Sequence, residues 1–473
     1  MKVDFEKLDR AFNPKVVAVV GDSKVSNYDW TRGQLMGREK KVYGVHVNPE
    51  SVRDLQALGV QTFPSILDIP EPVDLAIIAI PRSAAPAVLD DLIRKDAAAA
   101  HFFTAGFGES DTEEGRRLER LVVEKSIKAN FHLIGPNCMG LFNPAAGIKQ
   151  SSDQYHDVSG PVGFISQSGS VAISFSFEAH LQGIDIRKSV SYGNGIVLDS
   201  ADFLDYFAED QEIKVIGMYI EGVRNGERFF AALKSAAAKK PVIIWKGGRT
   251  EEGGRAIASH TGSLAASQAL WEASVRQCGA VNVQNMDDLI DTVKALIYLP
   301  EVFGNRMAIA GGPGGLSVTS TDIFAEAGLH VPLLTDESYA ELETFFEKVG
   351  GSYRNPIDSA GPVRRDMKRV MGILARDANI DNIFYIVSTR PGRNIGPEQL
   401  HGTLDTLDML KKTSAKPLIT AVFFHTPEAQ KVSREVMFKI QDMGIPAFPS
   451  VPRSATALKK ALDYYEGVRR RKE

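Results

Sequence analysis

Short runs of β-branched and other apolar residues alternate along the chain with longer segments that have helix-like composition. This alternation is typical of parallel β-sheets that are covered by helices. The predicted strands fall into three groups: residues 16–20, 42–47, 75–80, 101–104 and 131–134; residues 162–165, 188–191, 215–220 and 242–245; and residues 307–310, 383–387, 418–423 and 446–448. The pattern predicts an α/β fold with three doubly wound units.

The boundaries between these units follow from two breaks in the alternation. Residues 143–159 are polar and loop-like, and residues 299–306 carry Pro300 and Gly304, which are typical of a connection between elements. We therefore place breaks near residues 150 and 303. The predicted domains are residues 1–150, 151–303 and 304–473.

Composition excludes several classes of protein. The chain has 473 residues, of which 44% are hydrophobic, and 55 Lys and Arg against 59 Asp and Glu give a formal charge of −4, so we expect no nucleic-acid partner. The apolar runs are far shorter than the roughly 18 residues that cross a bilayer, and the first residues contain no apolar signal segment. The only two cysteines, Cys138 and Cys278, cannot build a disulfide framework. We expect a cytoplasmic protein with no membrane partner.

Small, polar and proline residues follow each predicted strand of the first unit, where ligands bind in an open parallel sheet. These strand ends are Gly21-Asp22-Ser23, Asn48-Pro49, Pro81-Arg82-Ser83, Gly106-Phe107-Gly108 and Gly135-Pro136-Asn137-Cys138. Any one of them is explained by ordinary turn chemistry, but five in succession favour a cleft. The G-x-G-x-x-G fingerprint is missing, and the second strand ends in Asn48-Pro49 where an acidic ribose ligand is expected, which makes a nicotinamide dinucleotide the weaker interpretation. Lys24, Arg38, Lys40 and Lys41 are candidate phosphate ligands or solvated surface cations.

The second unit contains a candidate anion site. The sequence Ser166-Gln167-Ser168-Gly169-Ser170 follows a predicted strand and precedes an apolar run that is typical of a buried helix. The N-terminus of such a helix offers free N–H groups to a phosphate. Plain capping of the helix by serine explains the same residues equally well.

A glycine-rich segment, Lys246 to Ser263, follows another predicted strand and contains His260. We expect a mobile loop whose imidazole, largely neutral at pH 7, can attack phosphorus or accept a proton. Glu221 ends the preceding strand and is placed to fix the tautomer of that ring. By themselves both residues are also explained as solvated side chains. Cys138 is expected to be a small buried hydrophobe without a catalytic role.

The segments GPNCMG, GFISQSGS, YIEGV and KGGRTEEGGRAIASHTGSLA closely resemble the nucleoside-diphosphate-forming acyl-CoA synthetases, relatives of succinyl-CoA synthetase. The resemblance extends from about Phe12 to Tyr465. It implies an N-terminal Rossmann-like CoA-binding domain followed by two flavodoxin-like ligase domains. It implies that phosphate lies at Gln167, Ser168 and Gly169. It also implies that His260 carries the phosphoryl group and that Glu221 orients the His260 ring. The residues implied for CoA binding are Gly21, Ser23, Lys24, Asn48, Pro81, Gly106 and Asn137.

The chain departs from the family pattern in one respect. These synthetases need an ATP-grasp portion that holds ATP or ADP with magnesium, and no part of the chain is left over for it. The turn AIAGGPGG of the third unit lacks the Lys-Ser/Thr ending of a P-loop. The resemblance therefore implies an α subunit that converts a carboxylic acid, CoA and phosphate and depends on an ATP-grasp β subunit in a hetero-oligomer. Action without such a partner, a CoA-binding regulatory or carrier protein, and more remotely an NAD-dependent oxidoreductase remain as alternatives.

Overall fold

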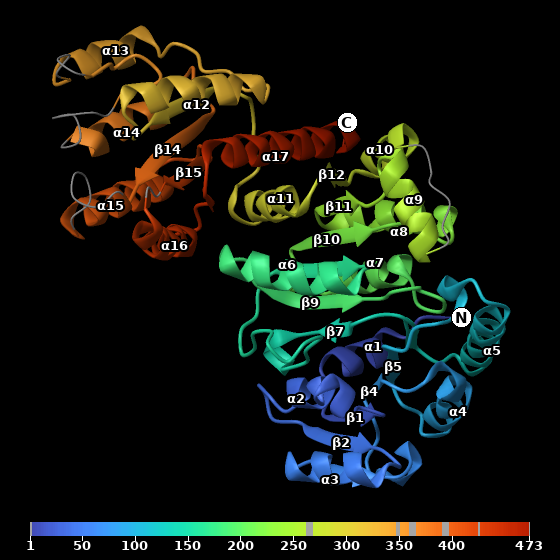
Figure 1. The fold of residues 1–473 in the computed structure, drawn as a ribbon. Coiled ribbons are helices and arrows are strands. Elements are labelled where there is room, and N and C mark those ends of the chain that lie inside the picture. The colour runs from blue at the N-terminus through green and yellow to red at the C-terminus, as the bar shows by residue number, and fades with distance from the viewer. Residues whose placement is uncertain are drawn as a thin grey trace. The chain divides into compact units, whose positions relative to one another are not determined.

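The computed structural model describes residues 2–261, 268–346, 351–358, 366–389, 397–423 and 426–472. The side chains of residues 257–261, 397–399, 428 and 472 lie outside this description. The chain divides into two compact units, Met1–Met286 and Asp287–Glu473, which are considered separately below (Figure 1). The predicted breaks near residues 150 and 303 stay predictions.

Three sheets form the framework of the described chain. The first has the order β3-β2-β1-β4-β5-β6, the second β12-β11-β10-β8-β9-β7 and the third β13-β14-β15-β16. All neighbouring strands are parallel except β7 and β9. The strands are β1 (Val16–Val20), β2 (Lys41–Val45), β3 (Gln61–Phe63), β4 (Leu75–Ile78), β5 (Ala99–Phe102), β6 (Leu133–Ile134), β7 (Gly140–Phe142), β8 (Val162–Ser166), β9 (Ile186–Ser191), β10 (Val215–Ile220), β11 (Val242–Lys246), β12 (Val281–Val283), β13 (Met307–Ala310), β14 (Asn382–Ser388), β15 (Leu418–Phe423) and β16 (Ala447–Phe448). The predicted α/β class with three doubly wound units is confirmed.

Helices connect these strands. They are α1 (Phe5–Phe12), α2 (Asp29–Gln34), α3 (Pro49–Ala57), α4 (Ala85–Arg94), α5 (Glu113–Ala129), α6 (Gly169–Leu181), α7 (Ser200–Glu209), α8 (Gly226–Lys239), α9 (Glu251–Thr261), α10 (Gln268–Cys278), α11 (Met286–Tyr298), α12 (Gly314–Glu326), α13 (Asp336–Glu343), α14 (Met367–Arg376), α15 (Pro397–Thr413), α16 (Pro427–Asp442) and α17 (Val451–Lys472). Short 3₁₀ turns are η1 (Lys24–Ser26), η2 (Ile66–Asp68), η3 (Arg82–Ala84), η4 (Gly108–Ser110) and η5 (Pro144–Ala146).

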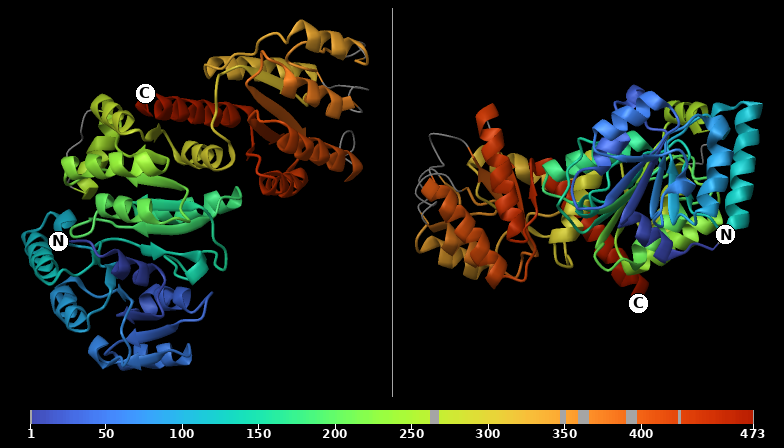
Figure 2. Two further views of the ribbon diagram at one scale, coloured as in Figure 1. Left: turned by 180° about the vertical axis from the view of Figure 1, so that it is seen from behind. Right: turned by 90° about the horizontal axis from the view of Figure 1, so that it is seen from below.

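The first sheet is buried on both faces. Alternate residues of each strand point to opposite sides of the sheet, and they pack into two separate hydrophobic clusters. Val17 and Val19 of β1 pack in one hydrophobic cluster with Trp30 of α2. Their neighbours Val16, Ala18 and Val20 pack in another cluster, with residues of α4 and α5. Figure 2 shows these helices on the two sides of the sheet.

The first and second sheets share a continuous core. Phe12 of α1 stacks on Tyr206 of α7 with ring centroids 5.6 Å apart, and both belong to a cluster that includes strands of both sheets. The buried Lys188 ammonium lies 3.0 Å from Asp9 Oδ1 and 2.8 Å from Asp210 Oδ2, and it donates to the hydroxyl of Tyr206. A buried charge is tolerated when it is paired in this way. The strand ends of the two sheets are thus held at a defined separation.

Three described strands are missing from the sequence-based prediction: β3, β7 and β12. Each has three residues, and in β3 and β12 most of the side chains are only partly buried, so none forms the continuous apolar run that marks a central strand. Strand β7 follows the first sheet in the chain but pairs with β9 of the second. Its assignment depends on a tertiary contact that the local sequence does not encode.

In the C-terminal unit, helices α11 and α17 lie side by side (Figure 1). Arg453 of α17 makes a two-pronged ion pair with the buried Asp291 of α11, with distances of 2.5 and 2.9 Å. Planar Arg–carboxylate pairs of this kind fix geometry as well as adding energy. This contact fixes the two helices against each other.

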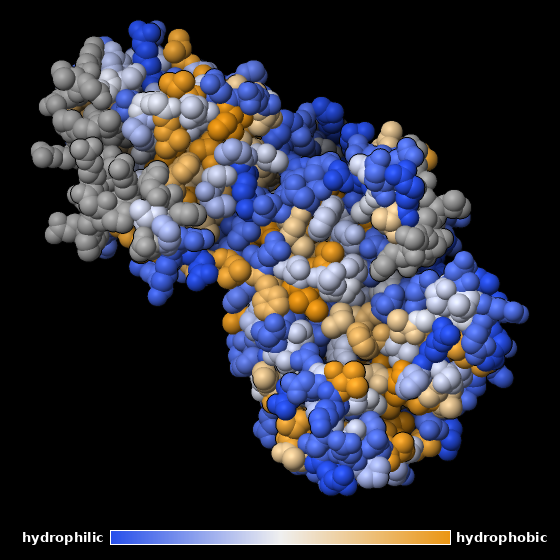
Figure 3. All heavy atoms as spheres, viewed as in Figure 1, coloured by the Kyte–Doolittle hydropathy of each residue, from blue (hydrophilic) through white to orange (hydrophobic). Residues whose placement is uncertain are grey.

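The visible surface is mostly hydrophilic, with hydrophobic residues in scattered groups (Figure 3). Among the described residues, no helix combines the length and the apolar composition needed to span a bilayer.

Candidate active site

A first cavity lies at the carboxyl edge of the first sheet, as predicted for an open parallel sheet. Its volume is about 350 Å³. The lining residues come from the ends of β1, β2 and β4, from the turn after β3 and from α4: Val20, Gly21, Val45, His46, Val47, Pro64, Ser65, Ile66, Ile80, Pro81, Ala84, Val88 and Asp91. Gly21 has φ +81°, and a Cβ there would lie 2.5 Å from Ile80 Cγ2. Only glycine fits at this point of the wall.

Two of the seven residues predicted for CoA line this first cavity, namely Gly21 and Pro81. Asn48 serves as the N-cap of α3, where its Oδ1 accepts the N–H of Glu50 at 2.8 Å. Lys24 is 79% exposed and lies 3.6 Å from Glu50 Oε1. Ser23 precedes η1 without capping it through its side chain.

The other two residues predicted for CoA, Gly106 and Asn137, lie away from this cavity. Gly106 accepts a hydrogen bond from Arg82 through its carbonyl and donates one to Glu109 through its N–H. Asn137 lines a second cavity, described below. The strand-end pattern therefore predicted residues that the fold distributes between two sites.

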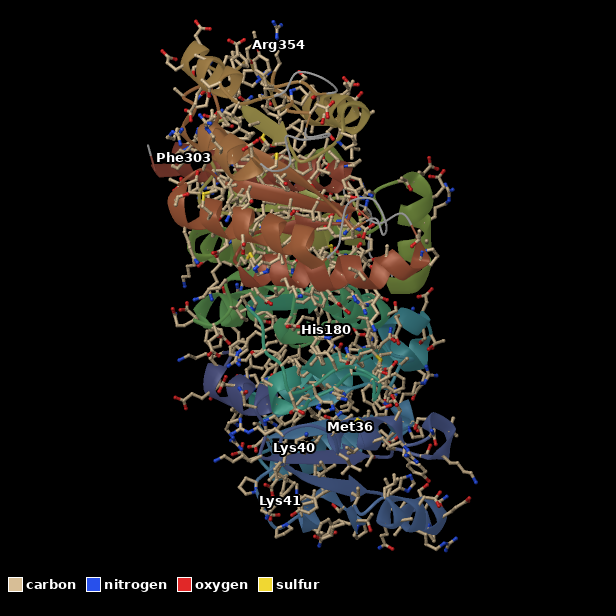
Figure 4. The ribbon with its side chains drawn as sticks, turned by 90° about the vertical axis from the view of Figure 1, so that its left-hand side faces the viewer. Met36, Lys40, Lys41, His180, Phe303 and Arg354 are labelled. Atoms are coloured by element: carbon tan, nitrogen blue, oxygen red, sulfur yellow. The ribbon has the colours of Figure 1, made fainter. Side chains whose placement is uncertain are left out.

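The candidate phosphate ligands Lys40 and Lys41, labelled in Figure 4, lie at the opposite edge of the sheet. Lys41 is the first residue of β2, whereas the cavity is formed beyond Val45, about 13 Å along the strand. Lys41 is paired with Glu71, and the hydrogen bond between them raises the pKa of the lysine. Lys40 donates to the carbonyl of Met36 at 2.9 Å, and burial lowers its pKa to about 8. Neither lysine contributes to the first cavity.

A second cavity, of about 230 Å³, lies where the two sheets of the N-terminal unit meet. It is lined by Phe103, Asn137, Cys138, Met139, Gln167, Ser168, Gly169, Ser170, Gly193, Asn194 and Glu221. The residues thus come from the ends of β5, β6, β8, β9 and β10. The fold brings the predicted phosphate residues and Glu221 together in this cavity.

Gln167 organises this cavity through its side chain. Its Oε1 accepts the N–H of Glu221 at 2.9 Å and that of Gly222 at 3.0 Å. Ser168 is the N-cap of α6, and its Oγ accepts the N–H of Val171 at 3.5 Å. The first turn of α6 therefore faces the cavity with the N–H groups that favour an anion.

Glu221 is half-buried at the end of β10. Its Oε1 accepts a hydrogen bond from the Tyr219 hydroxyl at 3.3 Å, while Lys246 donates to its backbone carbonyl at 2.7 Å. Burial raises the pKa of Tyr219, and the adjacent carboxylate adds to the effect. Burial lowers the pKa of Lys246. The carboxylate of Glu221 thus lies beside a phenol that stays protonated and can donate to it.

The glycine-rich segment is not the loop that the sequence predicted: residues Glu251–Thr261 form helix α9. The hydroxyl of Thr250 accepts the N–H of Gly253 at 3.0 Å, and Arg255 pairs with Glu251 one turn away. Acidic residues in the first turn and such i,i+4 pairs offset the cost of two glycines. His260 lies in the last turn of α9, and its side chain is outside the described part of the structure, so its predicted role stays a prediction.

Comparisons with known proteins agree with this geometry. Residues 15–144 match the model of the CoA binding domain, and residues 159–296 match that of the succinyl-CoA ligase like flavodoxin domain. The alpha subunit of the ADP-forming acetate–CoA ligase II of Pyrococcus furiosus is 34% identical over 96% of this chain and 97% of its own length. The alpha subunit of ligase I from the same organism is 31% identical over 98% and 99%. The chain belongs to the family of ADP-forming acetate–CoA ligase alpha subunits.

A solved structure supports the same assignment. The Ca. Korarchaeum cryptofilum dinucleotide-forming acetyl-coenzyme A synthetase 1, in complex with phosphate and ADP, superposes with a TM-score of 0.83. It is 29% identical, and the match covers 97% of each chain. The family resemblance predicted from the motifs is confirmed.

Within this ligase, Cys138 is not a nucleophile. The residue is buried, its Sγ contacts the carbonyl oxygens of Phe102 and Ile134 at 3.5 and 3.6 Å, and burial raises the pKa of the thiol to about 12. A thiol with this pKa stays protonated at neutral pH, and the thiolate is the reactive form.

Sequence reasoning missed several residues of the two cavities. His46, Ser65 and Asp91 line the first, and Phe103 and Asn194 line the second. The sequence did contain a signal for Asn194. It lies just after the predicted strand at residues 188–191, and residues just after the predicted strands of the first unit were the ones selected as candidates there. Asp91 lies within a helix and carries no such signal, so only the tertiary structure reveals it.

Proposed function

We propose that this chain performs the CoA, acyl and phosphate half of an ADP-forming acyl-CoA synthetase reaction. In one direction, acyl-CoA, phosphate and a nucleoside diphosphate give a carboxylic acid, CoA and a nucleoside triphosphate, and the reaction is reversible. The observation that carries the proposal is the second cavity, in which the N-terminus of α6 and Glu221 face Asn137 from the CoA-binding region.

The reaction divides into three transfers. A phosphate oxygen attacks the thioester carbonyl carbon, the C–O bond forms, and the C–S bond breaks with release of CoA. A ring nitrogen of His260 then attacks phosphorus, and the carboxylate leaves with the bonding electrons. Finally the phosphoryl group passes from His260 to the terminal oxygen of the nucleoside diphosphate. In the first two steps, negative charge lies on the carbonyl, phosphate and carboxylate oxygens, where the N–H groups at the N-terminus of α6 can stabilise it without reorganisation.

We assign the first cavity to part of CoA, with Gly21 and Pro81 in its wall and Ser23, Lys24, Asn48 and Gly106 at the neighbouring strand ends. Asn137, Gln167, Ser168 and Gly169 hold the phosphate and the thioester, and Glu221 orients the His260 ring. Gly21 has no side chain, so a ligand can approach the backbone closely at this point of the wall. This supports the assignment of the first cavity to CoA.

We further propose that an ATP-grasp β subunit supplies ATP or ADP with magnesium, in a cytoplasmic hetero-oligomer. The support is that both Pyrococcus furiosus relatives are alpha subunits and that this chain matches nearly their whole length. The two cysteines are unpaired, as is usual in a reducing compartment.

The test is intact-mass and acid-lability analysis of the purified chain after incubation with phosphate and a panel of acyl-CoAs. We expect an acid-labile phosphoryl adduct in the unsubstituted protein and none in His260→Ala. His180→Ala is the matched control, because His180, labelled in Figure 4, is a histidine outside the proposed site. Its Nδ1 lies 2.6 Å from Asp185 Oδ1. The acyl-CoA that supports the adduct identifies the substrate.

The main alternative gives a different result. A CoA-binding regulatory or carrier protein would bind CoA reversibly and form no adduct, even with an ATP-grasp partner present. That outcome would contradict the synthetase proposal.

A further inference from the structure

Asn194 is fixed by hydrogen bonds through both its backbone and its side chain. It follows β9 in a turn that lines the second cavity, and its N–H donates to the carbonyl of Pro136 at 3.0 Å. Arg224 donates to its carbonyl at 3.3 Å. Its side chain makes two further hydrogen bonds, so both ends of the amide are engaged.

The orientation of this amide is determined by Glu109. Asn194 Nδ2 lies 2.6 Å from Glu109 Oε2, and an ionised carboxylate only accepts hydrogen bonds. The nitrogen of Asn194 must therefore face Glu109, which directs its Oδ1 toward Nδ2 of Asn137, 3.4 Å away. The 2.6 Å hydrogen bond between Asn194 and the Glu109 carboxylate is charge-assisted, and such bonds are among the stronger hydrogen bonds in proteins.

Glu109 is itself fixed on the opposite side. Its Oε1 accepts the N–H of Gly106 at 2.5 Å, and the residue belongs to the 3₁₀ turn η4, which follows β5 of the first sheet. Glu109 does not line the cavity. It connects a strand end of the CoA-binding region to a polar side chain of the second cavity.

We propose that Glu109 is a positioning residue of the acyl-transfer step, acting through Asn194 on Asn137. This inference rests on the proposed function. Asn137 Nδ2 has two N–H groups, one of which is directed to Asn194 by the chain of hydrogen bonds. The orientation of the second is thereby set, so that it donates to an oxygen of the phosphate or of the thioester.

The chemistry gives this donor a role. When the phosphate oxygen attacks the carbonyl carbon, negative charge develops on the carbonyl oxygen of the tetrahedral intermediate. As that intermediate collapses, the C=O bond re-forms and the C–S electron pair leaves with the CoA thiolate. A pre-oriented amide N–H stabilises this charged oxygen in the transition state more than it stabilises the neutral carbonyl oxygen in the ground state. The effect should appear in kcat rather than in the binding of CoA.

The decisive substitution is Glu109→Gln. Glutamine keeps the size of the side chain but has only one side-chain oxygen. If that oxygen accepts the N–H of Gly106, the glutamine NH₂ group faces Nδ2 of Asn194, and two donors oppose each other. A flip of Asn194 would relieve that conflict and create a new one with Nδ2 of Asn137. Glu114→Gln is the matched control, because Glu114 lies in the same region, and its carboxylate pairs with Arg117 in the first turn of α5 rather than with Gly106 or Asn194.

The experiment measures steady-state CoA release from acyl-CoA, phosphate and a nucleoside diphosphate, with the ATP-grasp partner present, by Glu109→Gln, Asn194→Ala and the double variant. We expect Glu109→Gln to lower kcat about 10- to 100-fold with the Kd for CoA within about twofold. In the Asn194→Ala background the same substitution should cost less than about twofold, since its effect passes through Asn194. Equal kcat values for Glu109→Gln and Glu114→Gln, or an undiminished effect in the Asn194→Ala background, would overturn the proposal.

Crystal structures of Glu109→Gln and the unsubstituted protein provide a readout that does not need activity. We expect the Asn194 amide to lose its bond to Asn137 in the variant, and an unchanged pair of hydrogen bonds would reject the positioning role. If the unsubstituted protein releases no CoA, the proposed function fails, while the crystal structures still decide whether Glu109 orients Asn194.

Discussion

Gln167 Oε1 accepts the backbone N–H of Glu221 at a distance of 2.9 Å, which joins the turn after β8 to the end of β10. The two strands are neighbours in the second sheet. A side chain of the predicted phosphate site thus holds the backbone of the residue predicted to orient His260. The two parts of the cavity are consequently not independent.

Replacing Gln167 with methionine should weaken both folding and activity. Gln167→Met keeps the side-chain length but leaves two N–H groups, those of Glu221 and Gly222, without their acceptor. We expect a loss of about 2 kcal/mol in the free energy of unfolding and a fall of about tenfold or more in acyl-phosphate formation. Urea unfolding and CoA release measure the two effects. Gln211→Met, at an exposed position, should change neither.

Comparing substitutions at two glycines, Gly21 in the wall of the first cavity and Gly59 outside it, distinguishes backbone strain from loss of space in that cavity. Gly21 and Gly59 both have φ +81°, but a Cβ meets nothing within 4 Å at Gly59 and collides with Ile80 at Gly21. Gly59→Ala should cost about 1 kcal/mol of stability and leave CoA affinity unchanged. Gly21→Ala should cost more and weaken CoA binding at least about tenfold by calorimetry. Equal affinities for the two variants would remove Gly21 from the CoA site.

The substitution Glu221→Gln should separate the two chemical steps. It removes the negative charge while keeping the size of the side chain beside Tyr219. Acyl phosphate should still form, whereas phosphorylation of His260 should slow by about 10- to 100-fold, because a neutral amide holds the imidazole tautomer less strongly. Rapid-quench measurement of both intermediates tests this. Glu227→Gln, an exposed substitution in α8, is the control.

Stability should decrease with acid because of His101. This residue is fully buried, neither ring nitrogen has a hydrogen-bond partner among the described residues, and burial lowers its pKa to about 3. In the unfolded chain the His101 imidazole is protonated below about pH 6.5, whereas in the folded protein it is protonated only below about pH 3. The stabilisation is therefore complete above pH 6.5 and falls by about 1.4 kcal/mol for each pH unit below it.

His101→Leu tests this dependence. The urea midpoint of the variant should fall less between pH 7 and pH 4 than that of the unsubstituted protein. His401→Leu, which replaces a side chain that is 78% exposed, should leave the pH profile unchanged. Parallel profiles for the unsubstituted protein and His101→Leu would show that His101 does not carry the acid sensitivity.

The central strands could be predicted closely from the sequence. Four strands have the predicted bounds: Val16–Val20, Val215–Ile220, Met307–Ala310 and Leu418–Phe423. Each is composed almost entirely of apolar residues, with Thr420 as the polar exception, because both faces of a parallel strand are buried. The short strands β3, β7 and β12 lack this signal, and β7 is defined by its pairing with β9.

Helix α9 shows the opposite limit. Its glycines predicted a loop, but the cap at Thr250 and the pair between Arg255 and Glu251 favour a helix. Local propensity is a weak guide where several small contributions of opposite sign nearly balance.

The amino-acid sequence by itself determined the α/β class, the family, the strand-end turns and several of the residues that line the second cavity. These depend on local patterns of burial and on motifs read along the chain. Only the tertiary structure decided that Asn137 lies with Gln167 and Glu221 rather than with Gly21, and that Glu109 orients Asn194. Such relations join residues up to 85 positions apart, and they arise from the shared core of the two sheets, which no local pattern of the chain encodes.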